Sequence, residues 1–95
     1  MKITFQSIIG KHILVGITYL DKEGNITKQV QFDGTVIAAN QNESIIIKKT
    51  ESNEDFELPP DLSFLRVAAP GEYRLKSIEK TVINPDLLST LIISK

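Results

Sequence analysis

Two runs of alternating apolar and polar residues, His12–Leu20 and Ile26–Ala39, face each other across the polar segment Asp21–Asn25. A period of two places successive side chains on opposite faces of a β-strand. The segment between the runs contains Gly24 and Asn25, residue types that favour a hairpin turn. The pattern therefore predicts a β-hairpin that leads into a small barrel, and it carries no recognisable chemistry of its own.

The apolar faces of the two runs are expected to be buried. They are formed by Ile13, Val15, Ile17 and Tyr19 in the first run and by Ile26, Val30, Phe32, Val36 and Ala38 in the second. Because Asp33-Gly34 lies inside the second run without changing its phase, Gly34 predicts a bend in one long strand and not a turn. Small barrels need such a bend.

Short strand-like runs continue through the chain at intervals typical of all-β domains. They are expected at 44–49, 54–58, 72–76 and 81–83, with a single helical turn at 61–65 after Pro59-Pro60. Phe64 and Leu65 are expected to close one end of the barrel. The sequence thus predicts an all-β fold in one domain, residues 1–95: a small, strongly bent, mostly antiparallel barrel of five to seven strands, SH3-like or Sm-like in the broad sense.

The tail, residues 85–93, is compatible with two structures. Asn84-Pro85-Asp86 is a good helix start, with Asn as N-cap and Pro at the first helical position. The segment that follows is rich in Leu and Ile and is short for a helix, which favours a strand. Both alternatives stay open at this point.

Composition excludes several classes of site. The chain has 95 residues, no cysteine and one histidine, His12, so thiolate metal sites and cysteine nucleophiles are absent from it. Eleven basic and twelve acidic residues give a net charge of −1, which argues against nucleic acid as the partner. No apolar run approaches the length of a signal peptide or a membrane span, so we expect a cytoplasmic protein without a membrane partner.

Two resemblances follow from short motifs. The segment from Ile9 to Lys48, centred on Phe32-Asp33-Gly34-Thr35-Val36, resembles the first half of an Sm-like or SH3-like barrel. The Sm family binds uridine-rich RNA through an Asn, matched here by Asn40 or Asn42, and an Arg-Gly pair. Leu65-Arg66-Val67 lacks the Gly of that pair.

The second resemblance covers more of the chain. It rests on Val15-Gly16-Ile17-Thr18-Tyr19-Leu20-Asp21, Leu58-Pro59-Pro60-Asp61-Leu62 and Pro70-Gly71-Glu72-Tyr73-Arg74-Leu75-Lys76, closed by Asn84-Pro85-Asp86. These stretches resemble the motifs of a group of small uncharacterised bacterial proteins. The resemblance implies a compact bacterial domain and no catalytic residue.

Three groups of residues are candidates for partner binding. The acidic group is Glu54, Asp55 and Glu57, which would suit a basic protein; the basic group is Arg74 and Lys76; the apolar tail group is Leu91 and Ile93, which would pair two copies of the chain. Each group also has an ordinary structural explanation, as a solvated strand face or as part of the sheet.

The expected function is a non-enzymatic protein-interaction or adaptor module, because no convergent set of titratable residues is visible around His12. No catalytic residue, cofactor or metal ligand is expected. Two alternatives remain: an RNA-binding Sm-like barrel, and a small inhibitor or immunity-type protein that covers a basic partner with its acidic strand.

Overall fold

The computed structural model of the chain describes residues 2–75 and 79–94. Eight strands are present in this part: β1 His12–Leu20, β2 Ile26–Ala39, β3 Ile45–Lys49, β4 Asp55–Leu58, β5 Leu65–Val67, β6 Glu72–Leu75, β7 Lys80–Ile83 and β8 Leu87–Ser94. A short 3₁₀ helix, η1 Leu62–Phe64, precedes β5. The all-β prediction is therefore confirmed. Among the described residues, no helix has the length and hydropathy needed to span a membrane.

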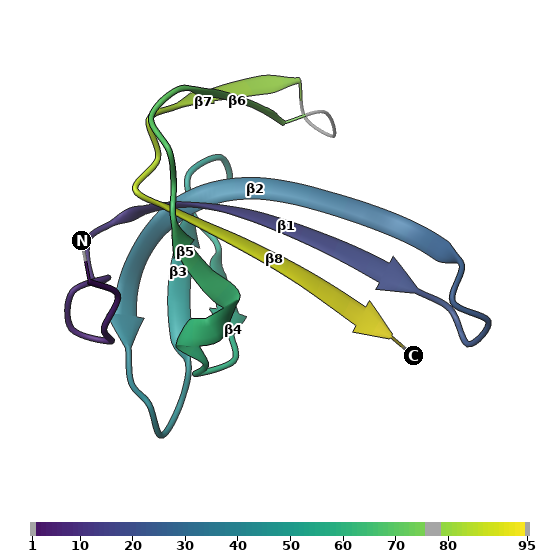
Figure 1. Cartoon of the computed structure of the whole chain (residues 1–95), viewed down its shortest axis with the longest axis horizontal. Coiled ribbons are helices and arrows are strands. Elements are labelled where there is room, and N and C mark those ends of the chain that lie inside the picture. Colours follow the sequence, from purple (N-terminus) through teal and green to yellow (C-terminus); the bar gives the residue numbers. More distant parts are fainter. Residues whose placement is uncertain (1, 76–78, 95) are drawn as a thin grey trace.

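Six strands form one open sheet in the order β4-β3-β2-β1-β8-β5, and β6 and β7 form a separate hairpin above it (Figure 1). The described strands do not close into a barrel, which differs from the expectation. The pairing of β1 with β8 is parallel, whereas the other neighbours are antiparallel. The tail is thus a strand, and it lies inside the sheet between β1 and β5.

The hairpin of β1 and β2 forms as the alternation predicts. Asp21 fixes its turn, because the Asp21 carboxylate accepts hydrogen bonds from the backbone N–H groups of Glu23 and Asn25. Gly24 supplies a φ of 85°, which suits glycine in a tight turn. The register then runs without a break from Tyr19↔Lys28 to His12↔Thr35.

Figure 1 shows that β2 is bent, as predicted, and Gly34 lies where β3 approaches this strand closely. A Cβ atom on Gly34 would lie 2.7 Å from Ile47 Cγ2 and even closer to the carbonyl oxygen of Lys48. Only glycine therefore allows β3 to approach β2 so closely at this point.

Two details of β2 were predicted wrongly. A register shift between Val36 and Ala38 reverses the alternation, so Ala39 packs against the core instead of Ala38. Ile26 is 61% exposed because it lies at the outer end of β2, beyond the part of the sheet that covers the core. The alternation of apolar and polar residues in the sequence predicts neither a bulge in a strand nor where the core ends along it.

The core lies on one face of the sheet and combines residues from β1, β2, β3, β4, β5 and β8 with one from the N-terminal segment. Its buried members are Ile8, Ile13, Val15, Ile17, Phe32, Val36, Ile45, Ile47, Leu58, Leu65, Leu87 and Leu91. Leu65 is buried as expected. Phe64 is not, because it lies on η1 with 38% of its surface exposed.

Asn84-Pro85-Asp86 links the hairpin to β8 and does not start a helix. The Asn84 N–H donates to the Gly71 carbonyl, and the Asn84 side-chain oxygen accepts from the Gly71 N–H, so Asn84 closes the base of the β6–β7 hairpin. Asp86 exchanges hydrogen bonds with the backbone of His12 and so aligns β8 with the start of β1. The residues expected to start a helix thus form hydrogen bonds with Gly71 and with His12 instead.

Candidate functional site

The outer edge of β8 is free over most of its length. On one side β8 pairs with β1 from Leu87 to Ser94, but on the other side β5 covers only Leu87 to Ser89. Among the described residues no strand pairs with this side of β8 from Thr90 to Ser94, and Figure 1 shows β8 extending well beyond β5. We call residues 90–94 the free edge of β8.

The free edge of β8 carries no charge and exposes apolar side chains. Its sequence is Thr90-Leu91-Ile92-Ile93-Ser94. Ile92 is 68% exposed and Ile93 40% exposed, whereas Leu91 is 7% exposed and belongs to the core. Of the two tail residues proposed from the sequence, Ile93 is thus accessible to a partner and Leu91 is occupied by the fold.

A hollow of about 140 Å³ marks the inner end of the free edge, where β5 stops covering β8. It is lined by Ser63, Phe64, Leu65, Arg66, Leu88 and Thr90. The exposed ring of Phe64 therefore lies next to the first residue of the free edge.

The opposite edge of the sheet, β4, has the features that prevent pairing. Asp55 and Glu57 are exposed on this strand, Glu54 precedes it, and Pro59 follows it. Charged residues and proline on an edge strand disfavour the addition of another strand. The acidic group therefore lies in solvent on one edge, and its single described ion pair is a 3.8 Å contact between Asp55 and Lys48.

The basic group is only partly described. Arg74 is exposed on β6, while Lys76 lies outside the described residues. Tyr73 points to the other side of β6 from Arg74 and is half-buried, and its hydroxyl donates to the Ala69 carbonyl at 2.7 Å. Tyr73 and Arg74 thus do not form a joint stacking surface.

A buried carboxylate connects three parts of the fold. Asp33 is 3% exposed and accepts hydrogen bonds from His12 Nε2 at 2.6 Å, Lys80 Nζ at 2.8 Å and the Thr50 hydroxyl at 3.2 Å. Lys80 also lies 2.6 Å from the exposed carboxylate of Glu51. Because a carboxylate only accepts, His12 presents its Nε2 hydrogen to Asp33. We call these five residues the Asp33 cluster.

The electrostatics of the Asp33 cluster favour ionised groups. Burial by itself would raise the pKa of Asp33, but the hydrogen bonds from Lys80 and His12, the charge of Lys80 and the Thr50 hydroxyl outweigh it and lower this pKa. The hydrogen bonds to Asp33 and Glu51 raise the pKa of Lys80. The cluster thus holds Lys80, at the start of β7, against the polar face of the sheet.

The Asp33 cluster acts as an anchor between the sheet and the hairpin. Both Asp33 oxygens are used within the fold, and the hydroxyl of Thr50 donates to the carboxylate. Within residues 2–75 and 79–94, no group of three or more His, Cys, Asp or Glu side chains could hold a metal ion. These contacts join β1, β2, the segment after β3 and the start of β7.

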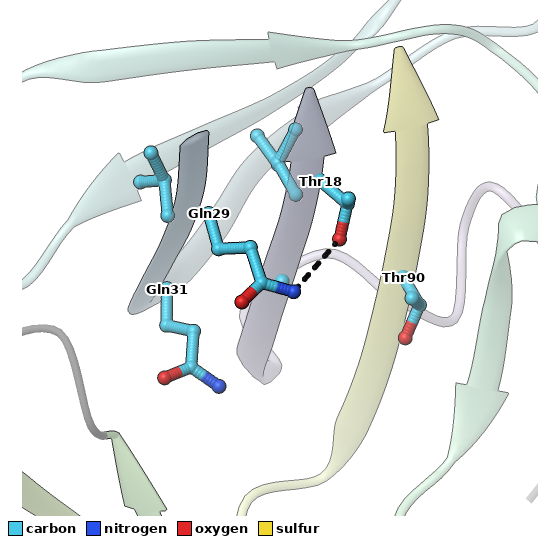
Figure 2. A pocket seen from close by; sticks show the side chains of 7 residues that line it. Thr18, Gln29, Gln31 and Thr90 are labelled. Atoms are coloured by element: carbon cyan, nitrogen blue, oxygen red, sulfur yellow. Dashed lines mark hydrogen bonds between the residues drawn. The ribbon is translucent and has the colours of Figure 1, made fainter. Parts of the chain in front are cut away.

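A shallow polar groove lies on the face of the sheet opposite the core. It has a volume of about 560 Å³ and is lined by Gly16, Ile17, Thr18, Gln29, Val30, Gln31 and Thr90. Figure 2 shows the side chains of Thr18, Gln29, Gln31 and Thr90 around it, from β1, β2 and β8. The Gln29 amide donates to the Thr18 hydroxyl at 3.4 Å, which is a long hydrogen bond.

Comparisons of the chain with known protein families, with curated proteins and with solved structures find no match.

Sequence reasoning missed both the Asp33 cluster and the groove. No convergent set of titratable residues was expected around His12, and Lys80 was not among the candidate residues. The available signal was Asp33, the only acidic residue in the long second run. A charged residue beside a buried Phe32 requires partners, but the sequence does not say which residues supply them.

Proposed function

We propose that the chain is a non-enzymatic protein-interaction module that pairs strand to strand along the free edge of β8, and that its partner there is a second copy of the chain. The observation that carries this proposal is the uncharged, exposed edge from Thr90 to Ser94. Natural proteins usually protect such edges with charges, prolines or covering segments. On this sheet β4 is protected in that way, whereas among the described residues nothing protects the free edge of β8.

A second copy of the chain fits this edge because two copies of the free edge of β8 do not repel each other. Two free edges that meet across a two-fold axis bring no like charges together, since residues 90–94 carry none. Pairing would also cover Ile92 and Ile93, which are exposed in the single chain.

Symmetry restricts the register of this pairing. Strands related by a two-fold axis perpendicular to the sheet are antiparallel, and each side chain stays on its own face. A residue can therefore lie opposite only a residue on the same face, as in Leu91 opposite Ile93 of the partner subunit. Centring the axis on Ile92 uses the whole free edge and places the two Ile92 side chains next to each other.

The test uses opposite charges at position 92. Ile92→Lys alone and Ile92→Asp alone should each be monomeric in light scattering, because like charges would meet at the axis. An equimolar mixture should form dimers, because the charges are then opposite. Ile83→Lys is the matched control, since Ile83 is 63% exposed but lies on β7, and it should dimerise like the original chain.

A cysteine variant tests the register. The chain has no cysteine, so Ile92→Cys introduces a single thiol. Directly opposite antiparallel residues have Cα atoms about 4.5 to 5.5 Å apart, within the range of a disulfide. Mild oxidation should give a covalent dimer. An original chain that is monomeric at all concentrations would refute the proposal, as would a mixture of the two charged variants that stays monomeric.

The acidic group supports one alternative, a small inhibitor that covers a basic partner. Glu54, Asp55 and Glu57 are all exposed and could contact such a partner. Neutralising the three residues should then abolish capture of the basic protein by the purified chain, whereas the Ile92 variants should not affect it. The RNA-binding alternative predicts salt-sensitive retention on single-stranded RNA that weakens on replacement of Arg74 and Lys76; no retention even at low salt would refute it.

The finer expectations on fold and place also stay predictions. A relationship to SH3-like or Sm-like barrels is supported by the long bent β2 alone. We expect the module to act in the cytoplasm.

A further inference from the structure

A position without a side chain lies in the middle of the polar face of the sheet. Gly16 on β1 pairs with Gln31 on β2 and with Thr90 on β8, so polar side chains lie on both sides of it. Along β1, Leu14 and Thr18 point to the same face as Gly16. These four residues therefore surround a gap in the layer of side chains above Gly16. Gly16, Thr18, Gln31 and Thr90 line the groove of Figure 2, and Leu14 lines an adjoining hollow.

The fold itself does not require glycine at this position. Gly16 lies inside a regular strand, and a Cβ atom built on it would meet nothing within 4 Å. Gly34 on the neighbouring strand differs, since a Cβ there would collide with β3. Glycine weakens the interior of a strand, and a glycine without a packing reason often marks the close approach of another molecule.

The groove is open to solvent, and both polar and apolar groups line it. Its volume of about 560 Å³ falls within the general range of about 300 to 1,000 Å³ for small-molecule sites, which are mostly apolar. An adjoining hollow of about 200 Å³ shares Gly16, Gln31 and Thr90 with it and adds Leu14, Leu88, Tyr73 and Arg66. One wall is thus polar and the other largely apolar.

The polar wall suits a ligand that is rich in hydroxyl groups. Thr18 and Thr90 carry hydroxyl groups and Gln29 carries a primary amide, and each of these groups both donates and accepts hydrogen bonds. Sugar hydroxyl groups do the same. The backbone of β1 already pairs with β2 and β8, so side chains must carry the recognition. An extended peptide, which binds through its backbone, would therefore find no free strand along β1.

The apolar wall suits the C–H face of a sugar ring. Leu14 and Leu88 are half-buried, and the hydrogen bond from Tyr73 to Ala69 fixes the position of the tyrosine ring. Among the described residues that line the groove and the hollow, Arg66 is the only charged one and none is acidic. The long Gln29–Thr18 hydrogen bond is weak enough to be exchanged for one to a ligand.

We propose that the groove over Gly16 binds a neutral sugar ring, with Thr18, Gln29 and Thr90 bonding its hydroxyl groups and with Leu14, Leu88 and Tyr73 covering its apolar face. This site goes beyond the proposed function and does not rest on it. The ring can come from a free saccharide or from the end of a glycan chain.

The first test is a titration of the full ¹⁵N-labelled chain, followed by NMR. The probes are the methyl glycosides of glucose, galactose, mannose and N-acetylglucosamine. At least one should give saturable shifts of the Gly16, Thr18, Gln29 and Thr90 amides. The same sugars at the ends of immobilised oligosaccharides form the second arm, and retention in that arm alone would identify a glycan chain as the source. No saturable shift and no retention in either arm would overturn the proposal.

The second test fills the gap. Gly16→Val should lower the affinity for the bound sugar about tenfold or more while leaving the unfolding midpoint unchanged or higher, because the added side chain occupies the groove without a clash in the fold. Gly16→Ala serves if the valine variant does not fold. Thr35→Val is the control, because Thr35 is exposed on β2 and lies outside the groove. This variant should bind the sugar as tightly as the original chain. Unchanged affinity in both Gly16 variants would refute the site.

Removal of single polar groups gives a finer test. Gln29→Ala and Thr90→Val should each lower the affinity about three- to tenfold, the effect of one neutral hydrogen bond. If neither variant changes the affinity while Gly16→Val abolishes binding, the ligand is not held by its hydroxyl groups and its assignment as a sugar is wrong.

Discussion

The ammonium group of Lys80 lies 2.8 Å from the carboxylate of Asp33, although 47 residues separate them in the chain. Asp33 is buried on β2 and Lys80 begins β7, so this contact joins the sheet to the hairpin above it. With His12 and Thr50 it keeps a charged group stable inside the fold.

Because of the Asp33 carboxylate, the free energy of unfolding should depend on pH in the acid range. The pKa of Asp33 is lowered in the folded state, so the stabilisation is complete above the unfolded pKa of about 3.9 and is lost as the pH falls through the folded pKa. The free energy of unfolding, measured with urea across this range, should fall more steeply for the original chain than for Asp33→Asn. A difference between the two proteins that is independent of pH would contradict this assignment.

Replacing Lys80 should destabilise the fold far more than replacing Glu51, the second partner of Lys80. Lys80→Met removes the charged hydrogen bond to a buried carboxylate and should cost about 2 kcal/mol of unfolding free energy. The matched variant Glu51→Gln breaks the other contact of Lys80, but Glu51 is exposed, so we expect a loss of about 0.5 kcal/mol or less. Faster hydrogen exchange of β6 and β7 amides should accompany Lys80→Met only. Equal effects of the two variants would argue against an anchor.

The two strand glycines should respond in opposite directions. Gly34→Ala forces a Cβ atom against Ile47 and the Lys48 backbone and should cost about 3 kcal/mol. Gly16→Ala meets nothing and should leave stability unchanged or raise it by about 0.5 kcal/mol. Urea unfolding of both variants checks the contrast, which fails if Gly34→Ala is as stable as Gly16→Ala.

The protein should be more stable with alanine in place of Ser89. The Ser89 hydroxyl is buried on the core side of β8 and has no hydrogen-bond partner among residues 2–75 and 79–94, and such a group costs about 1 kcal/mol or more. Ser89→Ala should therefore raise the midpoint of thermal unfolding, while Ser94→Ala, at an exposed position of the same strand, should not change it. A lower midpoint for Ser89→Ala would indicate that the hydroxyl has a partner.

Local patterns predicted most of the strands. The turn at Asp21, the bend at Gly34 and the helical turn after Pro60 depend on neighbouring residues, so the sequence contains their causes. Local patterns did not predict the features of the structure that depend on contacts with a distant segment of the chain. The parallel pairing of β8 with β1 and the contact of Lys80 with Asp33 join residues far apart in the chain, and alternation contains no information on such partners.

The candidate sites show the same division. Exposure of Asp55 and Glu57 followed from the alternation along β4. The alternation of β8 also separates Leu91 from Ile92, but the strand assignment was open and the buried face could not be chosen. Gly16 appeared as one more scattered glycine until its neighbours on β2 and β8 were known.

The position of β8 between β1 and β5 determines the order in which the sheet can assemble. Among the described strands, β5 pairs in the sheet with β8 alone, and β8 is aligned with β1 through His12 and Asp86, which are 74 residues apart. Closing so long a loop is entropically costly, and folds dominated by such contacts form slowly. A chain emerging from the ribosome therefore cannot dock β5 before residues 87–89 have been synthesised, and the sheet should be completed late.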